Sequence, residues 1–157
     1  MNRSLERLYN RVQNVFQRGR HISANDIGDV QLVQVRLGDG ELADGVENLQ
    51  AYGLTSNAHE GAEHLTVFRG GSRDSPLVIL VGDRRYRLHP LKTGDVALYS
   101  SGENYVIMRA SGDIEIHTPK NLVMSADGDI SVNAGGKIDI ASGGDTTIVT
   151  GGKLYLN

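Results

Sequence analysis

The segment HEGAEH, residues 59–64, is the part of this sequence that comes closest to a catalytic motif. Zinc proteases use HExxH on one helix, where two histidines bind the metal and the glutamate acts as general base. Here Glu63 stands where the second histidine is required, and Gly61 weakens a helix. We therefore interpret the segment as a loop between strands and not as a metal site.

A second motif imitates a dinucleotide fingerprint. Gly38, Gly40 and Ala43 have the spacing GxGxxA after an apolar run. In dinucleotide-binding proteins this pattern opens a helix, but Gly45 follows at once and no helical periodicity succeeds it. The pattern favours a hairpin turn.

The arginines at 84, 85 and 87, around Tyr86, suggest a nucleic-acid strip on a small barrel. If residues 84–88 form a strand, Arg85 and Arg87 share one face while Tyr86 and Leu88 share the other, as in any half-solvated strand. We expect these arginines to meet a protein partner or an adjacent subunit.

The remaining reactive side chains form no recognisable active site. His89 precedes Pro90 and His117 precedes Thr118 and Pro119, which indicates structural roles. No Ser/His/Asp set or carboxylate pair is evident. We expect no enzyme activity, no cofactor and no metal ligand.

Composition narrows the class of protein. The chain has 157 residues with 20 glycines, no tryptophan and no cysteine, and its net charge is -3. These values favour a turn-rich β protein without disulfides and argue against a sequence-independent grip on nucleic acid. No apolar run is long enough for a membrane-spanning helix, and the first 20 residues lack the apolar core of a secretory signal. Synthesis and assembly in the cytosol are expected.

The pattern divides the chain into three regions: an N-terminal arm (1–21), a β domain (22–103) and a repeat (104–157). In the arm, Leu5, Leu8, Val12 and Val15 have helical spacing, so residues 2–18 are predicted to form a short helix that stops at Gly19. Because the apolar stripe is narrow, a docking arm is favoured over a membrane-surface helix.

The β domain is predicted from short alternating runs separated by glycines. Five strands are expected, at residues 29–37, 64–68, 77–81, 84–88 and 95–99. Five short strands in so short a stretch are typical of a small closed barrel of the oligonucleotide/oligosaccharide-binding (OB) type.

From Asn104 the chain follows a repeat of eight residues: NYVIMRAS, GDIEIHTP, KNLVMSAD, GDISVNAG, GKIDIASG, GDTTIVTG and GKLYLN. Position one supplies the turn glycines Gly112, Gly128, Gly136, Gly144 and Gly152. Positions three and five are apolar except for Thr146. They supply the predicted core Val106, Met108, Ile114, Ile116, Leu122, Met124, Ile130, Val132, Ile138, Ile140, Ile148, Leu154 and Leu156.

Each block therefore predicts one strand with a single apolar face and a bend after it. One chain cannot enclose a core with so few side chains per strand, and a one-chain β-helix needs longer coils. Three intertwined chains, each forming one side of a prism, bury the apolar faces on a common axis. We predict a triple-stranded β-helix whose folding and trimerisation are one event.

The sequence resembles the baseplate spike proteins of Mu-like contractile phages. The resemblance begins at Tyr52 with YGLTSNAHEGAEHLTVFRGG and continues through LVILVGDRRYRLHPLKTGDVALYSSGENYVIMRASGDIEI into the repeat. It implies a homotrimeric virion protein of the tail baseplate, seated by its barrel on hub and tail-tube proteins, whose stalk pierces the host outer membrane without catalysis.

The sequence departs from that family at one point. Similar spikes often end in a tip where His-x-His pairs bind iron, and this sequence contains no His-x-His. A missing tip segment, a tip-capping protein and a blunt tip all stay open. An alternative function is a trimeric adhesin-like fibre whose barrel binds glycans, and a third is an oligonucleotide-binding barrel on a trimeric stalk.

Overall fold

The computed structural model describes residues 5–6, 9, 12, 15–38 and 40–155. It forms two compact units, residues 1–120 and 121–157. Among its described residues, the first unit holds eight strands and one 3-10 turn, η1. In chain order these are β1 (Phe16–Asn25), β2 (Leu32–Leu37), β3 (Leu42–Asn48), β4 (Glu63–Phe68), η1 (Arg69–Gly71), β5 (Pro76–Gly82), β6 (Val96–Tyr99), β7 (Tyr105–Met108) and β8 (Ile114–His117).

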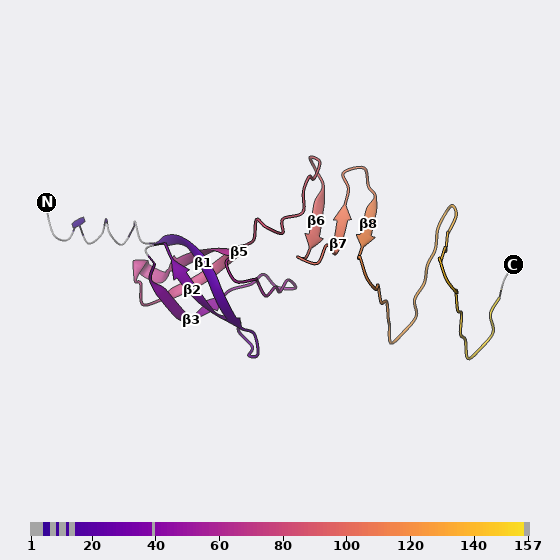
Figure 1. Cartoon of the computed structure of the whole chain (residues 1–157), viewed down its shortest axis with the longest axis horizontal. Coiled ribbons are helices and arrows are strands. Elements are labelled where there is room, and N and C mark those ends of the chain that lie inside the picture. The colour runs from indigo at the N-terminus through magenta and orange to yellow at the C-terminus, as the bar shows by residue number, and fades with distance from the viewer. Residues whose placement is uncertain (1–4, 7–8, 10–11, 13–14, 39, 156–157) are drawn as a thin grey trace. The chain divides into compact units, whose positions relative to one another are not determined.

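Five of the strands close into a barrel in the order β1-β2-β3-β5-β4, with β4 paired back to β1 (Figure 1). All neighbours are antiparallel except β3 and β5, which pair in parallel. The predicted all-β class and the small closed barrel are confirmed. The OB type of that barrel stays a prediction.

The barrel core is small and consists of side chains that alternate along the strands. β2 and β4 bury every second residue, as expected of strands with one face inward. The core comprises Val33, Val35, Leu37, Val46, Phe68 and Val78.

Two histidines complete the interior. His21 and His64 are 2% and 3% exposed, and Nδ1 of His64 forms a 2.8 Å hydrogen bond with the Thr66 hydroxyl. Nδ1 of His21 and Nε2 of His64 make no well-formed hydrogen bond with a described residue, although the carbonyls of Arg36 and Arg20 lie near the His64 ring. Burial lowers the pKa of both histidines.

The N-terminal prediction was partly wrong. Leu5, Glu6, Tyr9 and Val12 are helical, and the other residues predicted at 2–14 lie outside the described ones. However, β1 begins at Phe16, so residues 16–18 are strand. Gly19 does not end a helix: it lies inside β1, where it pairs with Leu37 on one side and His64 on the other.

Two predicted barrel strands were also wrong. Residues 84–88 are not a strand: residues 84–86 turn, because the Asp83 carboxylate accepts hydrogen bonds from the Arg85 backbone (3.0 Å) and guanidinium, and residues 87–88 are irregular. Residues 96–99 are a strand, but they pair with β7 in a separate antiparallel sheet, β6-β7-β8. β1 and β3, which were not predicted, take their places in the barrel.

In the second unit, residues 121–155 contain no strand in this single chain. Bends recur every eight residues, at 127–128, 135–136, 143–144 and 151–152. The period of the backbone therefore equals the period of the sequence. The triple-stranded β-helix itself stays a prediction.

Candidate assembly surface

The β6–β8 sheet has one face that is apolar throughout. Residues directly opposite each other in an antiparallel ladder share a face. The register aligns Val96 with Met108 and Ile114, and Leu98 with Val106 and Ile116. Six apolar side chains from three strands thus lie together.

This apolar face is open to solvent in the single chain. The side chains at its edge strands are more than half exposed: Val96 56%, Leu98 54%, Ile114 68% and Ile116 58%. A contiguous apolar sheet face of this kind marks an interaction surface.

The opposite face of the same sheet carries Ile107, which is 4% exposed between Ala97 and Glu115, and paired polar side chains around it. Arg109 pairs with Asp95 at 3.3 Å and with Glu115 at 2.7 Å, and the Tyr105 hydroxyl donates to Glu115 at 2.7 Å. The hydrogen bond from Arg109 lowers the pKa of Glu115, and the one from the Ala110 backbone lowers the pKa of Asp95. This face has the character of an exterior surface.

The second unit also exposes the apolar positions of the repeat. Side chains at positions three and five of the blocks are exposed: Leu122 59%, Met124 70%, Ile130 57%, Val132 67%, Ile138 51%, Ile140 80%, Ile148 64% and Leu154 53%. The structure thus brings four predicted core residues, Val106, Met108, Ile114 and Ile116, onto one sheet face, and the other described ones are exposed in the second unit. Leu156 lies outside the described residues.

Sequence reasoning missed Val96 and Leu98 as members of this surface. Residues 94–101, GDVALYSS, have the same pattern as GDIEIHTP at 112–119, with Gly102 and Glu103 inserted before the next block. The backbone repeats as well, since Gly94 and Gly112 have φ values of 88° and 97°. An insertion of two residues hid the first block.

The turn glycines of the second unit behave differently from Gly112. At Gly128, Gly136 and Gly144 the backbone is outside the left-handed region, and an added Cβ has no neighbour within 4 Å. Bends lie at these glycines, but their φ angles are not positive. Nothing within the single chain requires glycine at these positions.

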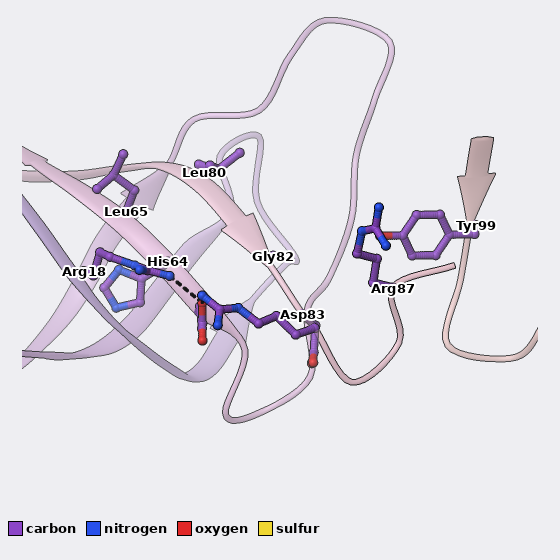
Figure 2. A pocket seen from close by; sticks show the side chains of 10 residues that line it. Arg18, His64, Leu65, Leu80, Gly82, Asp83, Arg87 and Tyr99 are labelled. Carbon is purple, nitrogen blue, oxygen red and sulfur yellow. Dashed lines mark hydrogen bonds and ion pairs between the residues drawn. The ribbon is translucent and has the colours of Figure 1, made fainter. Parts of the chain in front are cut away.

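The arginines singled out by the sequence are divided among different partners. Arg84 pairs with Glu63 at 3.1 Å, and Arg85 pairs with Asp83 at 2.6 Å. Arg87 lines a cavity of about 400 Å³ together with Arg18, Glu63 and Tyr99. In Figure 2, Arg87 lies beside the Tyr99 ring, whereas Arg18 lies near His64 on the barrel. Arg85 and Arg87 therefore do not share the strand face that was predicted for them.

The described residues contain neither a metal-binding cluster nor a helix that could span a membrane. Among the described residues, no group of three or more His, Cys, Asp or Glu side chains is placed to hold a metal ion. Within the same residues, no helix combines the length and apolarity that crossing a bilayer requires.

The barrel belongs to a known class of domain. Residues 18–85, which begin inside β1 and end just after β5, match the family described as Bacteriophage Mu Gp45, N-terminal. A curated relative, the baseplate puncturing device gp45 of Escherichia phage Mu, is 41% identical over 99 residues. The aligned part covers 63% of this chain and 50% of the relative, so the chain spans about half the length of the curated relative it matches. The predicted resemblance is confirmed: the barrel matches a phage Mu Gp45 domain, and the chain is similar to a Mu baseplate puncturing device.

Proposed function

We propose that this chain is a structural, non-enzymatic component of a contractile phage tail, the homotrimeric central spike of the baseplate. The phage Mu relative is a baseplate puncturing device, and this supports a structural role in the baseplate. By this proposal the protein resides in the virion and is assembled in the host cytoplasm.

The observation that carries the proposal is the exposed apolar face of β6–β8 together with the exposed apolar positions of the repeat. One chain leaves this face in water, and its opposite face is already paired by Arg109 and Glu115. Burying one Ile or Leu stabilises by roughly 1.5–3 kcal/mol before costs. Three copies arranged as a prism bury every such side chain on one axis.

The same arrangement accounts for the glycines at the bends. Glycine is favoured wherever a second backbone approaches closely. Because nothing in the single chain approaches Gly128, Gly136 or Gly144, we infer that neighbouring chains do so in the trimer.

The mechanism is force transmission. Sheath contraction drives a stiff rod whose buried axis resists splaying, and the rod pierces the outer membrane without residing in it. The barrel seats the rod on hub and tail-tube proteins. No nucleic acid and no cofactor take part.

Two measurements test this function. Light scattering of the native particle is expected to give three times the subunit mass of 17.0 kDa. Phage that carry a variant with a weakened stalk axis are expected to adsorb normally but fail to deliver their genome. A particle of one subunit with an ordered repeat contradicts the proposal, as does saturable, specific glycan binding by residues 22–103, which indicates an adhesin.

A further inference from the structure

The outer surface of the barrel carries an excess of arginine around one carboxylate. Glu63 on β4 pairs with Arg18 at 2.7 Å, with Arg20 at 3.5 Å and with Arg84 at 3.1 Å. Arg36 lines the same surface, and Arg87 lines the adjoining cavity seen in Figure 2. We call these five arginines and Glu63 the arginine cluster.

The arginine cluster is far from neutral. Neither Arg36 nor Arg87 forms an ion pair with any described residue, and Arg18, Arg20 and Arg84 share one acid. The three sharing side chains are 59–73% exposed, so their guanidinium groups are available to a partner. Guanidinium forks bind carboxylates in pairs of parallel hydrogen bonds.

A complementary acidic surface lies elsewhere on the same barrel. Asp26, Asp29 and Glu47 line one cavity of about 300 Å³, and none of them forms an ion pair with a described residue. Arg20 and Arg36 pair at one end of the β1–β2 ladder, whereas Asn25 and Leu32 pair at the other. Leu32 and Arg36 are four positions apart on β2, which is roughly 13 Å along the strand.

Both surfaces also have apolar side chains beside the charges. Ile27 is 95% exposed next to the acidic residues, and Leu49 and Leu54 are 54% and 58% exposed in the same loops. Leu80, 64% exposed, lines the arginine cavity. Protein–protein contacts combine apolar side chains at their centre with polar and charged side chains at the rim.

We propose that neighbouring barrels dock through these two surfaces, the arginine cluster of one copy receiving Asp26, Asp29 and Glu47 of the next. This inference rests on the proposed trimer. In a threefold ring each contact joins one surface of a subunit to a different surface of its neighbour, so a barrel that carries both charges can supply both sides of every contact. Single-stranded nucleic acid fits less well, because Tyr99 is the one aromatic side chain among the described lining of this surface, and stacking needs several.

Zero-length cross-linking of the full chain tests the docking directly. A carbodiimide joins a lysine to a carboxylate that touches it, and residues 16–82 contain no lysine. Arg36→Lys therefore places one reactive amine in the cluster, and Arg69→Lys, on an exposed arginine that forms no ion pair with a described residue, is the matched control. We expect covalent dimers and trimers for R36K, with residue 36 linked to Asp26, Asp29 or Glu47 by peptide mass spectrometry.

The link must also depend on charge. Adding Asp29→Asn and Glu47→Gln to R36K, or raising the salt to 1 M, where the screening length is about 3 Å, is expected to reduce the product to the R69K level.

Other outcomes overturn the inference in distinguishable ways. A native trimer without this link rejects the docking and leaves the proposed function intact, whereas a native monomer rejects both. Salt-dependent binding of a labelled oligothymidine that is lost in Arg36→Glu/Arg87→Glu assigns the cluster to nucleic acid instead.

Discussion

Gly19 is the residue whose role the structure changes most. An added Cβ at this position lies 2.2 Å from the Arg36 carbonyl oxygen and 2.6 Å from Nε2 of His64. Both neighbours belong to the barrel wall or interior, so neither moves without disturbing strand pairing. Glycine is therefore required here for close approach and not for an unusual φ angle.

Gly19→Ala is accordingly expected to destabilise the barrel. Overpacking of this kind costs about 1–3 kcal/mol in the free energy of unfolding, measured by chemical denaturation of the full chain. Gly82→Ala is the matched control, because an added Cβ in β5 meets no atom within 4 Å. Equal stabilities for the two variants contradict the steric argument.

The buried histidines predict how stability depends on pH. Burial lowers the folded-state pKa of His21 and His64 below 6.5, so the unfolded chain binds more protons as the pH falls. Stability is therefore fully present above about 6.5 and is lost as the pH falls through the lowered pKa values. The ring of His64 faces His21, Thr66 and the carbonyls of Arg20 and Arg36. Among the described residues, no carboxylate contributes to the pKa shift of either histidine.

Replacing His21 by Leu is expected to flatten this dependence. The slope of the unfolding free energy between pH 6.5 and 5 falls by at most about 1.4 kcal/mol per pH unit for each proton removed. His89→Gln, at an exposed position, serves as the control and is expected to keep the wild-type slope. An unchanged slope in the His21 variant refutes the titration of this site.

At the scale of elements, the sequence predicted strands where apolar alternation was strong and failed where the barrel interior is polar. β1 presents Gly19 and His21 to the interior, so it has no apolar period, and Gly45 interrupts the alternation in β3. Residues 84–88 alternate well, but the side chain of Asp83 turns the chain. The repeat was recognised because its period is long and strict, except where two inserted residues conceal its first block.

The β6–β8 sheet predicts that its two faces respond differently to mutation. The wild-type trimer is expected to resist heat and detergent and to run as a slow band on an unboiled gel. Leu98→Asp puts a charge on the apolar face, so this band is expected to disappear. Glu115→Gln, on the opposite face, removes an exposed ion pair that contributes little to stability and is expected to leave that band unchanged. Equal effects at both positions contradict the assignment of the faces.

At the scale of the whole molecule, the proposed trimer couples folding of the repeat to assembly. Residues 121–155 have no strand of their own and keep their large apolar side chains exposed, so nothing in one chain stabilises an ordered stalk. Such a segment gains its order only when other copies bind, and its stability then depends on protomer concentration. Interchain strand ladders also make dissociation slow, which suits a rod that acts under load.

The register of the repeat gives the sharpest test of this coupling. Ile130 and Ile138 occupy position three of their blocks, whereas Val123 occupies position four and is 83% exposed. Aspartate at Ile130 and Ile138 buries uncompensated charges on the axis three times over, so the trimer is expected to dissociate with an unfolded repeat. Val123→Asp faces outward and is expected to keep the trimer. Light scattering after size-exclusion chromatography separates the outcomes. A compact trimer of the Ile130→Asp/Ile138→Asp variant refutes the burial of these side chains on the trimer axis, because a core position does not tolerate a charge as well as the exposed Val123 does.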